Sequence, residues 1–165
     1  MNKQPSKMQR GYVLLITLVM LIVLTLLALT EAVLNTTQTR VAANATDSEV
    51  SFEKTEAALN EAIDYLFNGT YASANFLQNN NGLYIFNVNA SPLWTTINWS
   101  GPAVINSFAG GTGSQASYII EQLPSVIQPG QNMQTPTNIY RITARSVGAN
   151  GNSSILIQTT VQIQQ

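Results

Sequence analysis

The chain has 165 residues, of which 45% are hydrophobic and only 9% are charged, where about 25% charged is usual in a soluble domain. Seven basic and eight acidic residues give a net charge of −1, so there is no basic surface to hold a nucleic-acid backbone and direct nucleic-acid binding is not expected. Because Cys and His are absent, disulfides, thiol chemistry, imidazole bases and nearly every zinc site are excluded, and no metal or other cofactor is expected.

The first predicted element is an apolar helix that can cross a bilayer. Residues 12–29 carry no charge, and only Thr17 and Thr25 among them are polar. At about 1.5 Å rise per residue this stretch spans roughly 27 Å, close to the roughly 30 Å hydrocarbon core of a membrane. The sequence therefore predicts a single membrane-crossing helix.

The flanking charges predict its orientation. Lys3, Lys7 and Arg10 precede the apolar stretch, and the first acidic residue is Glu31, so the N-terminus is expected in the cytoplasm and the remainder outside the membrane. A secretory signal peptide and an ordinary anchor both fit these charges. The nearest small-x-small cleavage site, at 28–30, is a poor one, which favours an anchor over a signal peptide and leaves a more specialised segment as the third alternative.

The helix is predicted to continue well beyond the membrane. No Gly or Pro occurs between Tyr12 and Phe67, and Asn68-Gly69 then supplies a C-terminal stop. Its second half carries an apolar stripe for a head domain to cover: Val41, Ala45, Phe52, Leu59, Ile63 and Leu66. The charged residues on the opposite face are interpreted as its solvated face rather than as a catalytic or metal cluster: Asp47, Glu49, Glu53, Lys54, Glu56, Glu61 and Asp64.

From Thr70 onward the hydrophobic period becomes alternating, which predicts a β-rich head. The expected strands are Leu83 to Val88, Leu93 to Trp99, Ser117 to Leu123, Ile139 to Val147 and Ile155 to Ile163. A turn at 148–152 joins the last two strands into a hairpin, and one apolar face of this hairpin is expected to pack on the helix stripe. The stretches 78–82, 110–114 and 128–138 are expected to be loops, and none has the spacing of a calcium or phosphate loop.

Two pairs of head residues are candidates for binding. Arg141 and Arg145 project from the same side of their strand and either bind an anion or are simply solvated. Trp94 and Trp99 either stack on a sugar or partner surface or belong to the rim of the core. No nucleophile has a base beside it, so an enzyme is not expected.

A short basic leader, Lys7-Met8-Gln9-Arg10-Gly11, is followed at once by the apolar helix beginning Tyr12-Val13-Leu14-Leu15-Ile16. This pattern resembles a type IV pilin precursor. The resemblance implies that a membrane-bound prepilin peptidase cuts between Gly11 and Tyr12 and methylates the new amine of Tyr12. It also implies that the freed helix leaves the bilayer to pack inside a filament.

One position departs from the pilin pattern. Most pilins carry glutamate at the fifth mature residue, where it is thought to neutralise the terminal amine of a neighbouring subunit, whereas this chain has Ile16. A buried ammonium without a partner costs several kcal/mol. If each incoming carboxylate serves the amine of a subunit assembled earlier, only the first subunit can lack it without cost, so Ile16 indicates a place at the tip.

Two further stretches narrow the resemblance: Phe52 to Leu59, with its Glu-Ala-Ala-Leu core, and Tyr140 to Gly148. Both resemble the PilX-type minor pilins and the related tip pseudopilins of type II secretion. The head is too small for the inserted domain of the pseudopilins, which favours the PilX type. The resemblance implies an α+β type IV pilin fold, with a long N-terminal helix packed on an antiparallel sheet. The expected divisions are a leader (1–11), a membrane and filament-core half-helix (12–35), an amphipathic half-helix (36–67) and a β-rich head (68–165).

The function implied is a structural one: a minor pilin that helps initiate a type IV pilus and stays in its tip complex. The partners implied are other minor pilins, the major pilin, a large tip adhesin, the prepilin peptidase and, before assembly, the inner membrane. The head is expected first in the periplasm and then at the extracellular pilus tip, and adhesion or twitching motility would follow from the whole fibre. The alternative is a membrane-tethered or secreted periplasmic module that recognises glycan or peptide through Trp94 and Trp99.

Overall fold

The computed structural model describes residues 9–108, 116–127, 129–130, 136–149, 151 and 153–164. The predicted loop at 110–114 and the first eight residues of the predicted leader lie outside these ranges. The chain divides into two compact units, residues 1–43 and 44–165, and each is described by itself.

One helix, α1 (Gln9–Phe67), runs through both units. It begins three residues before the predicted start and ends at the predicted residue, where Asn68 N–H bonds to the Asp64 carbonyl and Gly69 takes φ +79°. Only glycine adopts this left-handed conformation at low cost. The Gly- and Pro-free run therefore predicted the helix correctly.

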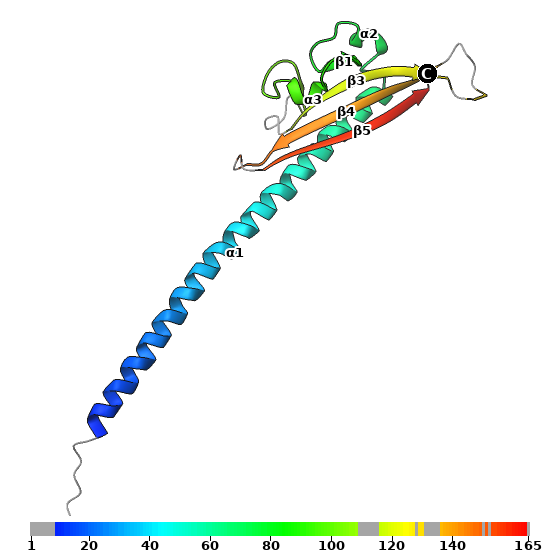
Figure 1. The fold of residues 1–165 in the computed structure, drawn as a ribbon. Helices are drawn as coiled ribbons and strands as arrows, with labels where there is room; N and C mark the ends of the chain where they lie inside the picture. The colour runs from blue at the N-terminus through cyan, green and yellow to red at the C-terminus, as the bar shows by residue number, and fades with distance from the viewer. Residues whose placement is uncertain are drawn as a thin grey trace, which may run out of the picture. The chain divides into compact units, whose positions relative to one another are not determined.

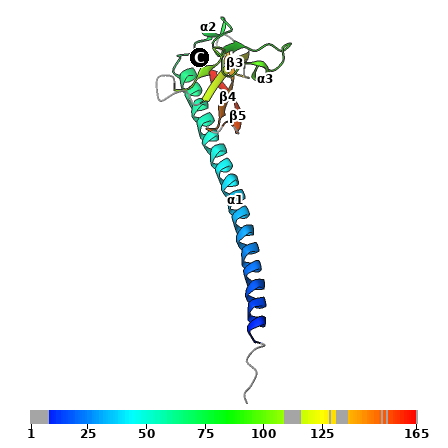
Figure 2. The same cartoon turned by 90° about the vertical axis from the view of Figure 1, so that its left-hand side faces the viewer.

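The second unit places a five-stranded mixed sheet on the last part of α1, residues 44–67 (Figures 1 and 2). The strands are β1 (Leu83–Ile85), β2 (Ile105–Asn106), β3 (Ala116–Val126), β4 (Thr137–Val147) and β5 (Ser154–Gln164). Two short helices, α2 (Ser73–Phe76) and α3 (Leu93–Thr96), lie in the connections. The class is α+β, as predicted.

The sheet order is β1-β3-β4-β5, and β2 pairs with the same edge of β3 that β1 occupies. β3, β4 and β5 are antiparallel, with Ile142 opposite both Ile120 and Thr159. β1 runs parallel to β3, so the predicted antiparallel sheet is mixed at this edge. The register of β3 shifts between Leu123 and Val126, where Pro124 has no N–H to donate to the ladder.

The strand predictions fared unequally. β3, β4 and β5 confirm three of them, each extended by two to four residues. The predicted strand Leu83 to Val88 is shorter, and α2 and β2 were not foreseen. The predicted strand Leu93 to Trp99 was wrong, because Pro92 begins a helical turn there: the Thr95 amide and hydroxyl both donate to the Pro92 carbonyl, at 3.0 and 2.6 Å.

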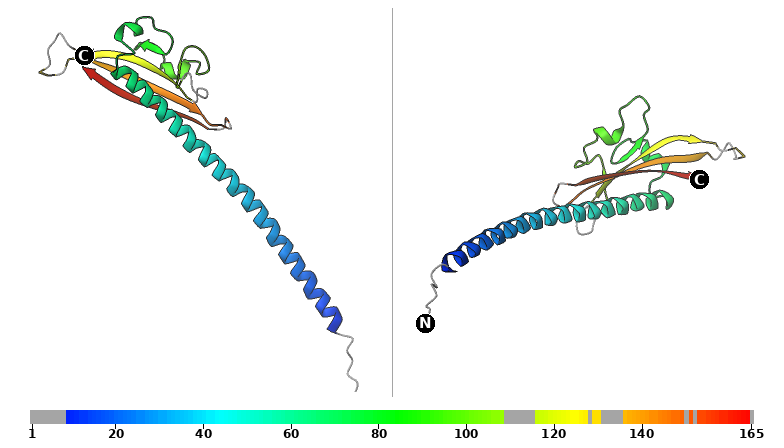
Figure 3. Two further views of the ribbon diagram at one scale, coloured as in Figure 1. Left: turned by 180° about the vertical axis from the view of Figure 1, so that it is seen from behind. Right: turned by 60° about the horizontal axis from the view of Figure 1, so that its bottom comes forward.

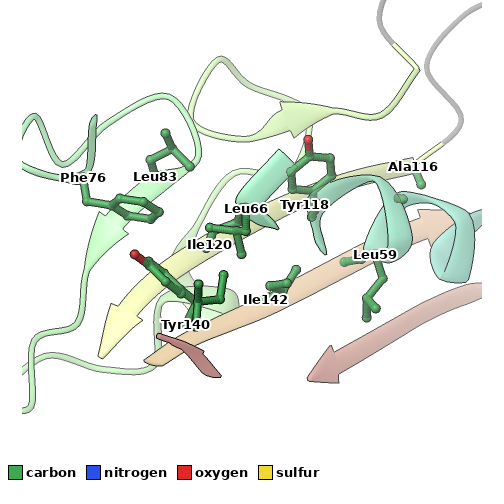
Figure 4. Close-up of a cluster of buried hydrophobic side chains, with 13 residues drawn as sticks. Leu59, Leu66, Phe76, Leu83, Ala116, Tyr118, Ile120, Tyr140 and Ile142 are labelled. Atoms are coloured by element: carbon green, nitrogen blue, oxygen red, sulfur yellow. The ribbon is translucent and has the colours of Figure 1, made fainter. Parts of the chain in front are cut away.

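The core lies between α1 and the inner face of the sheet. Figure 4 shows Tyr118, Ile120, Tyr140 and Ile142 directed towards the helix that carries Leu66. The other buried members are Ala58, Leu59, Ala62, Phe76, Leu83, Ala116, Ala144 and Ile163. Alanines 58 and 62 are fully buried, and their small side chains let the strands approach the helix backbone closely.

The predicted helix stripe was correct at its C-terminal end only. Leu59 and Leu66 are buried and Ile63 packs against the core, but Phe52 is 49% exposed and Val41 and Ala45 are exposed too. Their places on the covered face are taken by Ser51 and Thr55, which are fully buried. Both polar side chains form hydrogen bonds with serines of the β4–β5 hairpin.

Candidate assembly segment and head surfaces

The N-terminal part of α1 is a fully exposed apolar cylinder in this chain. Its 18-residue window of highest hydropathy has a mean of 3.0 and no buried residue, and the helix is long and apolar enough to cross a membrane. The hydroxyl of Thr17 donates to the Leu14 carbonyl at 2.9 Å, and Thr25 bonds in the same way to Leu21. The polar groups are thus satisfied within the helix, as apolar surroundings require.

The residues predicted for processing and position share this helix. Gly11 and Tyr12 lie in its first turn, and Ile16 follows one turn after Tyr12. Residues four apart lie on one face of a helix, so α1 brings the side chains of Tyr12 and Ile16 together. Tyr12 is 69% and Ile16 40% exposed, and both are accessible to a neighbouring helix.

A chain of hydrogen bonds joins α1 to the β4–β5 hairpin. Thr55 Oγ1 donates to Ser146 Oγ at 2.9 Å, and Ser146 Oγ donates to the Ser51 carbonyl at 2.6 Å. Ser51 Oγ lies 3.2 Å from Ser153 Oγ, which donates to Asp47 Oδ2 at 2.6 Å. Asp47 is buried, so its assignment to a solvated face was wrong: its carboxylate accepts a charge-assisted bond from the head.

A second network connects α1 to β3. Tyr71 and Tyr118 hydroxyls lie 2.9 Å apart, Tyr118 donates to Glu61 Oε1 at 3.3 Å, and the Phe108 amide donates to Glu61 Oε2 at 2.8 Å. Burial raises the pKa of the Tyr118 phenol well above its ordinary value, and the neighbouring Tyr71 and Glu61 raise it further. Burial also raises the pKa of Tyr71. Glu61 is half-buried and accepts both bonds, so it is a structural acceptor as well as a partly solvated charge.

The outer face of β3 and β4 carries both predicted arginines. Arg141 forms an ion pair with the buried Glu121 of β3, with Nε and Nη2 each 2.9 Å from Oε2, and its guanidinium stacks on Phe86 at 4.9 Å. Arg145 stacks on Trp99 at 5.9 Å and donates to Ser154 Oγ at 3.0 Å. The two arginines are therefore separately engaged, and they are neither a joint anion site nor simply solvated.

The two tryptophans are likewise separated. Trp99 Nε1 donates to the Trp94 carbonyl at 3.2 Å, but the two rings line different cavities, Trp94 with Arg141 and Trp99 with Arg145. Trp94 lies at the rim, 36% exposed. Within the described ranges no group of three His, Cys, Asp or Glu residues is placed to hold a metal ion.

A long apolar N-terminal helix whose C-terminal part is packed under a β-sheet is the α+β architecture of a type IV pilin. The family described as "Type IV pilus assembly protein PilX C-term" matches residues 35–163. The chain belongs to this family, whose members are structural components of pilus assembly, and its apolar helix fits a membrane anchor. No curated protein and no solved structure matched the chain.

Sequence reasoning missed the partners of these side chains. Glu121 was not singled out, although a lone acid in an otherwise apolar strand is itself a signal that a buried cation lies nearby. Asp47 had no such signal, because its partner Ser153 is more than a hundred residues away.

Proposed function

We propose that this protein is a minor pilin that helps to initiate a type IV pilus and remains in its tip complex, with a structural and interaction role and no catalysis. The observation that carries the proposal is the match to the PilX family over most of the chain, joined to an apolar N-terminal part of α1 that has no buried residue. Burying that surface in a filament core removes a large apolar area from water, at about 25 cal/mol per Å².

In this proposal residues 1–11 are a leader, which the prepilin peptidase removes between Gly11 and Tyr12 before methylating Tyr12. Residues 12–35 form first the inner-membrane anchor and then the filament core, residues 36–67 continue the helix, and residues 68–165 form the head. The three cations before the apolar stretch support a periplasmic head. The head then reaches the extracellular tip, among other minor pilins, the major pilin and a large adhesin.

Processing is tested by the intact mass of the protein purified from piliated cells. We expect the loss of residues 1–11 and the gain of one methyl group. In a Gly11→Asp variant the precursor should stay in the membrane and the number of surface fibres should fall, while Ser6→Asp in the same leader serves as the control. An uncut wild-type chain, or one cut beyond Leu29, would contradict the proposal.

The tip position rests on Ile16, whose side chain has no charge to offer to the amine of a neighbouring subunit. We expect an Ile16→Glu variant to gain entry to the fibre shaft, because its carboxylate can pair with an amine in the apolar core. Ile16→Leu is the matched control and should stay at the tip. Immunogold labelling along sheared fibres measures the distribution, and tip-only labelling of Ile16→Glu would refute the missing-carboxylate argument.

A further inference from the structure

The head has a cavity of about 420 Å³, and the connection from β1 to α3 lies on the opposite face of the sheet from α1 (Figure 3, right). The chain from β1 to α3 forms most of its lining, and β3 and β4 each contribute one charged residue, Glu121 and Arg141. Its volume is within the range of small-molecule sites, about 300–1,000 Å³. None of these residues belongs to the helix that the proposed assembly uses.

The deepest lining residues are a neutral ion pair. The Glu121 side chain is 4% and the Arg141 side chain 19% exposed. Both Arg141 contacts, from Nε and Nη2, run to one oxygen, Oε2. Because a guanidinium carries five N–H donors and Arg141 lines the cavity, the side chain has donors that this oxygen does not engage.

Aromatic side chains complete the lining. Tyr84 is held by its hydroxyl, which donates to the Ala103 carbonyl at 2.7 Å, and Phe86 is held beneath the Arg141 guanidinium. Trp94 stands at the rim and offers a partly exposed ring. Asn79 and Asn87 add amide groups beside these rings. The lining thus combines apolar ring faces with hydrogen-bonding groups of both kinds.

We propose that this cavity binds a neutral sugar unit. A free anion would meet the Glu121 carboxylate and a free cation the Arg141 guanidinium, so the pair favours a ligand without net charge. Adjacent sugar hydroxyls can accept from the guanidinium and donate to the carboxylate or an amide, while the C–H face of the ring packs on an aromatic side chain. The proposal assigns the sugar contact to Trp94 and leaves Trp99 out, since Trp99 lines a different cavity.

The test is saturation-transfer NMR on the full chain in dodecylphosphocholine, a detergent without a sugar head. The probes are lactose, cellobiose, maltose and N,N′-diacetylchitobiose, with 3′-sialyllactose and glucuronic acid as charged counterparts. We expect saturable binding of at least one neutral disaccharide. Trp94→Ala should weaken it by about tenfold or more, the loss of one stacked ring, and Trp99→Ala should leave it within about twofold.

A second variant guards against a loss of fold. Ser91 is exposed and lines the cavity, so Ser91→Trp fills the cavity from its rim without touching the ion pair and should abolish binding. Near-UV circular dichroism checks that both Ser91→Trp and Trp94→Ala remain folded. Binding of none of the neutral probes, binding of charged probes alone, or undiminished binding by folded Ser91→Trp would overturn the proposal. Fibre counts in a Trp94→Ala strain stay normal in every case, which separates this outcome from a failure of the assembly role.

Discussion

Gly148 lies where the β4–β5 hairpin touches α1, and replacing it by alanine tests that contact directly. The Gly148 amide donates to the Ser153 carbonyl at 2.8 Å. A Cβ at this position would lie well under 3.0 Å from both Asp47 Oδ2 and Ser153 Oγ, a separation that real Cβ atoms essentially never show. Because Asp47 is buried and bonded, it cannot swing away as an exposed side chain would.

The expected cost follows from the bonds that must break. Moving Asp47 sacrifices the bond from Ser153 Oγ to its carboxylate, worth about 1.5–3 kcal/mol for a charged acceptor, and strains the Ser51–Ser153 contact, worth about 1 kcal/mol. The lower entropy of alanine in the unfolded chain returns about 0.4–1 kcal/mol. The net destabilisation is about 2–3 kcal/mol, which for a unit of this size lowers Tm by on the order of 10 °C.

The assay is thermal unfolding of the full chain in detergent, followed by near-UV circular dichroism. Gly101→Ala is the control, because the atoms nearest to its Cβ would be those of the Asn98 side chain and carbonyl, at 3.2 Å or more; its Tm should change little. In an Asp47→Ala background Gly148→Ala should cost less than half as much, since the main obstacle is gone. A wild-type Tm for Gly148→Ala would show that the hairpin does not press on Asp47.

Three further outcomes are expected. Leu66→Ala, at a buried helix position, should destabilise the head by about 2–5 kcal/mol, whereas Phe52→Ala on the same helix should cost under about 0.5 kcal/mol; equal losses in urea unfolding would show that the covered face is misplaced. Glu121→Ala should destabilise the head by about 3–5 kcal/mol because it leaves Arg141 without its ion-pair partner. Adding Arg141→Met should restore part of the lost Tm, and the absence of any recovery would contradict that cause. Above about pH 10 the unfolded chain loses the Tyr118 proton, whereas the folded protein retains it because burial raises the pKa of Tyr118. The free energy of unfolding should therefore fall with rising pH by up to about 1.4 kcal/mol per pH unit. An equally steep fall in Tyr118→Phe would refute this.

The sequence alone was enough for the elements that depend on near neighbours. A run without Gly or Pro from Tyr12 to Phe67 predicts a helix, because nothing in it interrupts the i to i−4 hydrogen bonds. The β4–β5 hairpin was equally clear, since alternating strands on either side of a glycine-containing turn can pair only one way. The exposed apolar half of α1 was also evident, because hydropathy is a property of the segment itself.

Only the tertiary structure decided which residues of these elements meet. The sequence predicted Asp47 and Glu61 to be solvated charges. In the structure their carboxylates accept hydrogen bonds from Ser153 and Tyr118. The sequence predicted Phe52 to lie in the core. It is exposed because the strands pack on the neighbouring face of α1, which carries the small polar residues Ser51 and Thr55. These pairings join residues 57 to 106 positions apart, so no local sequence pattern can predict them. The packing of the sheet on the helix determines which side chains enter the core, form ion pairs or stay on the surface.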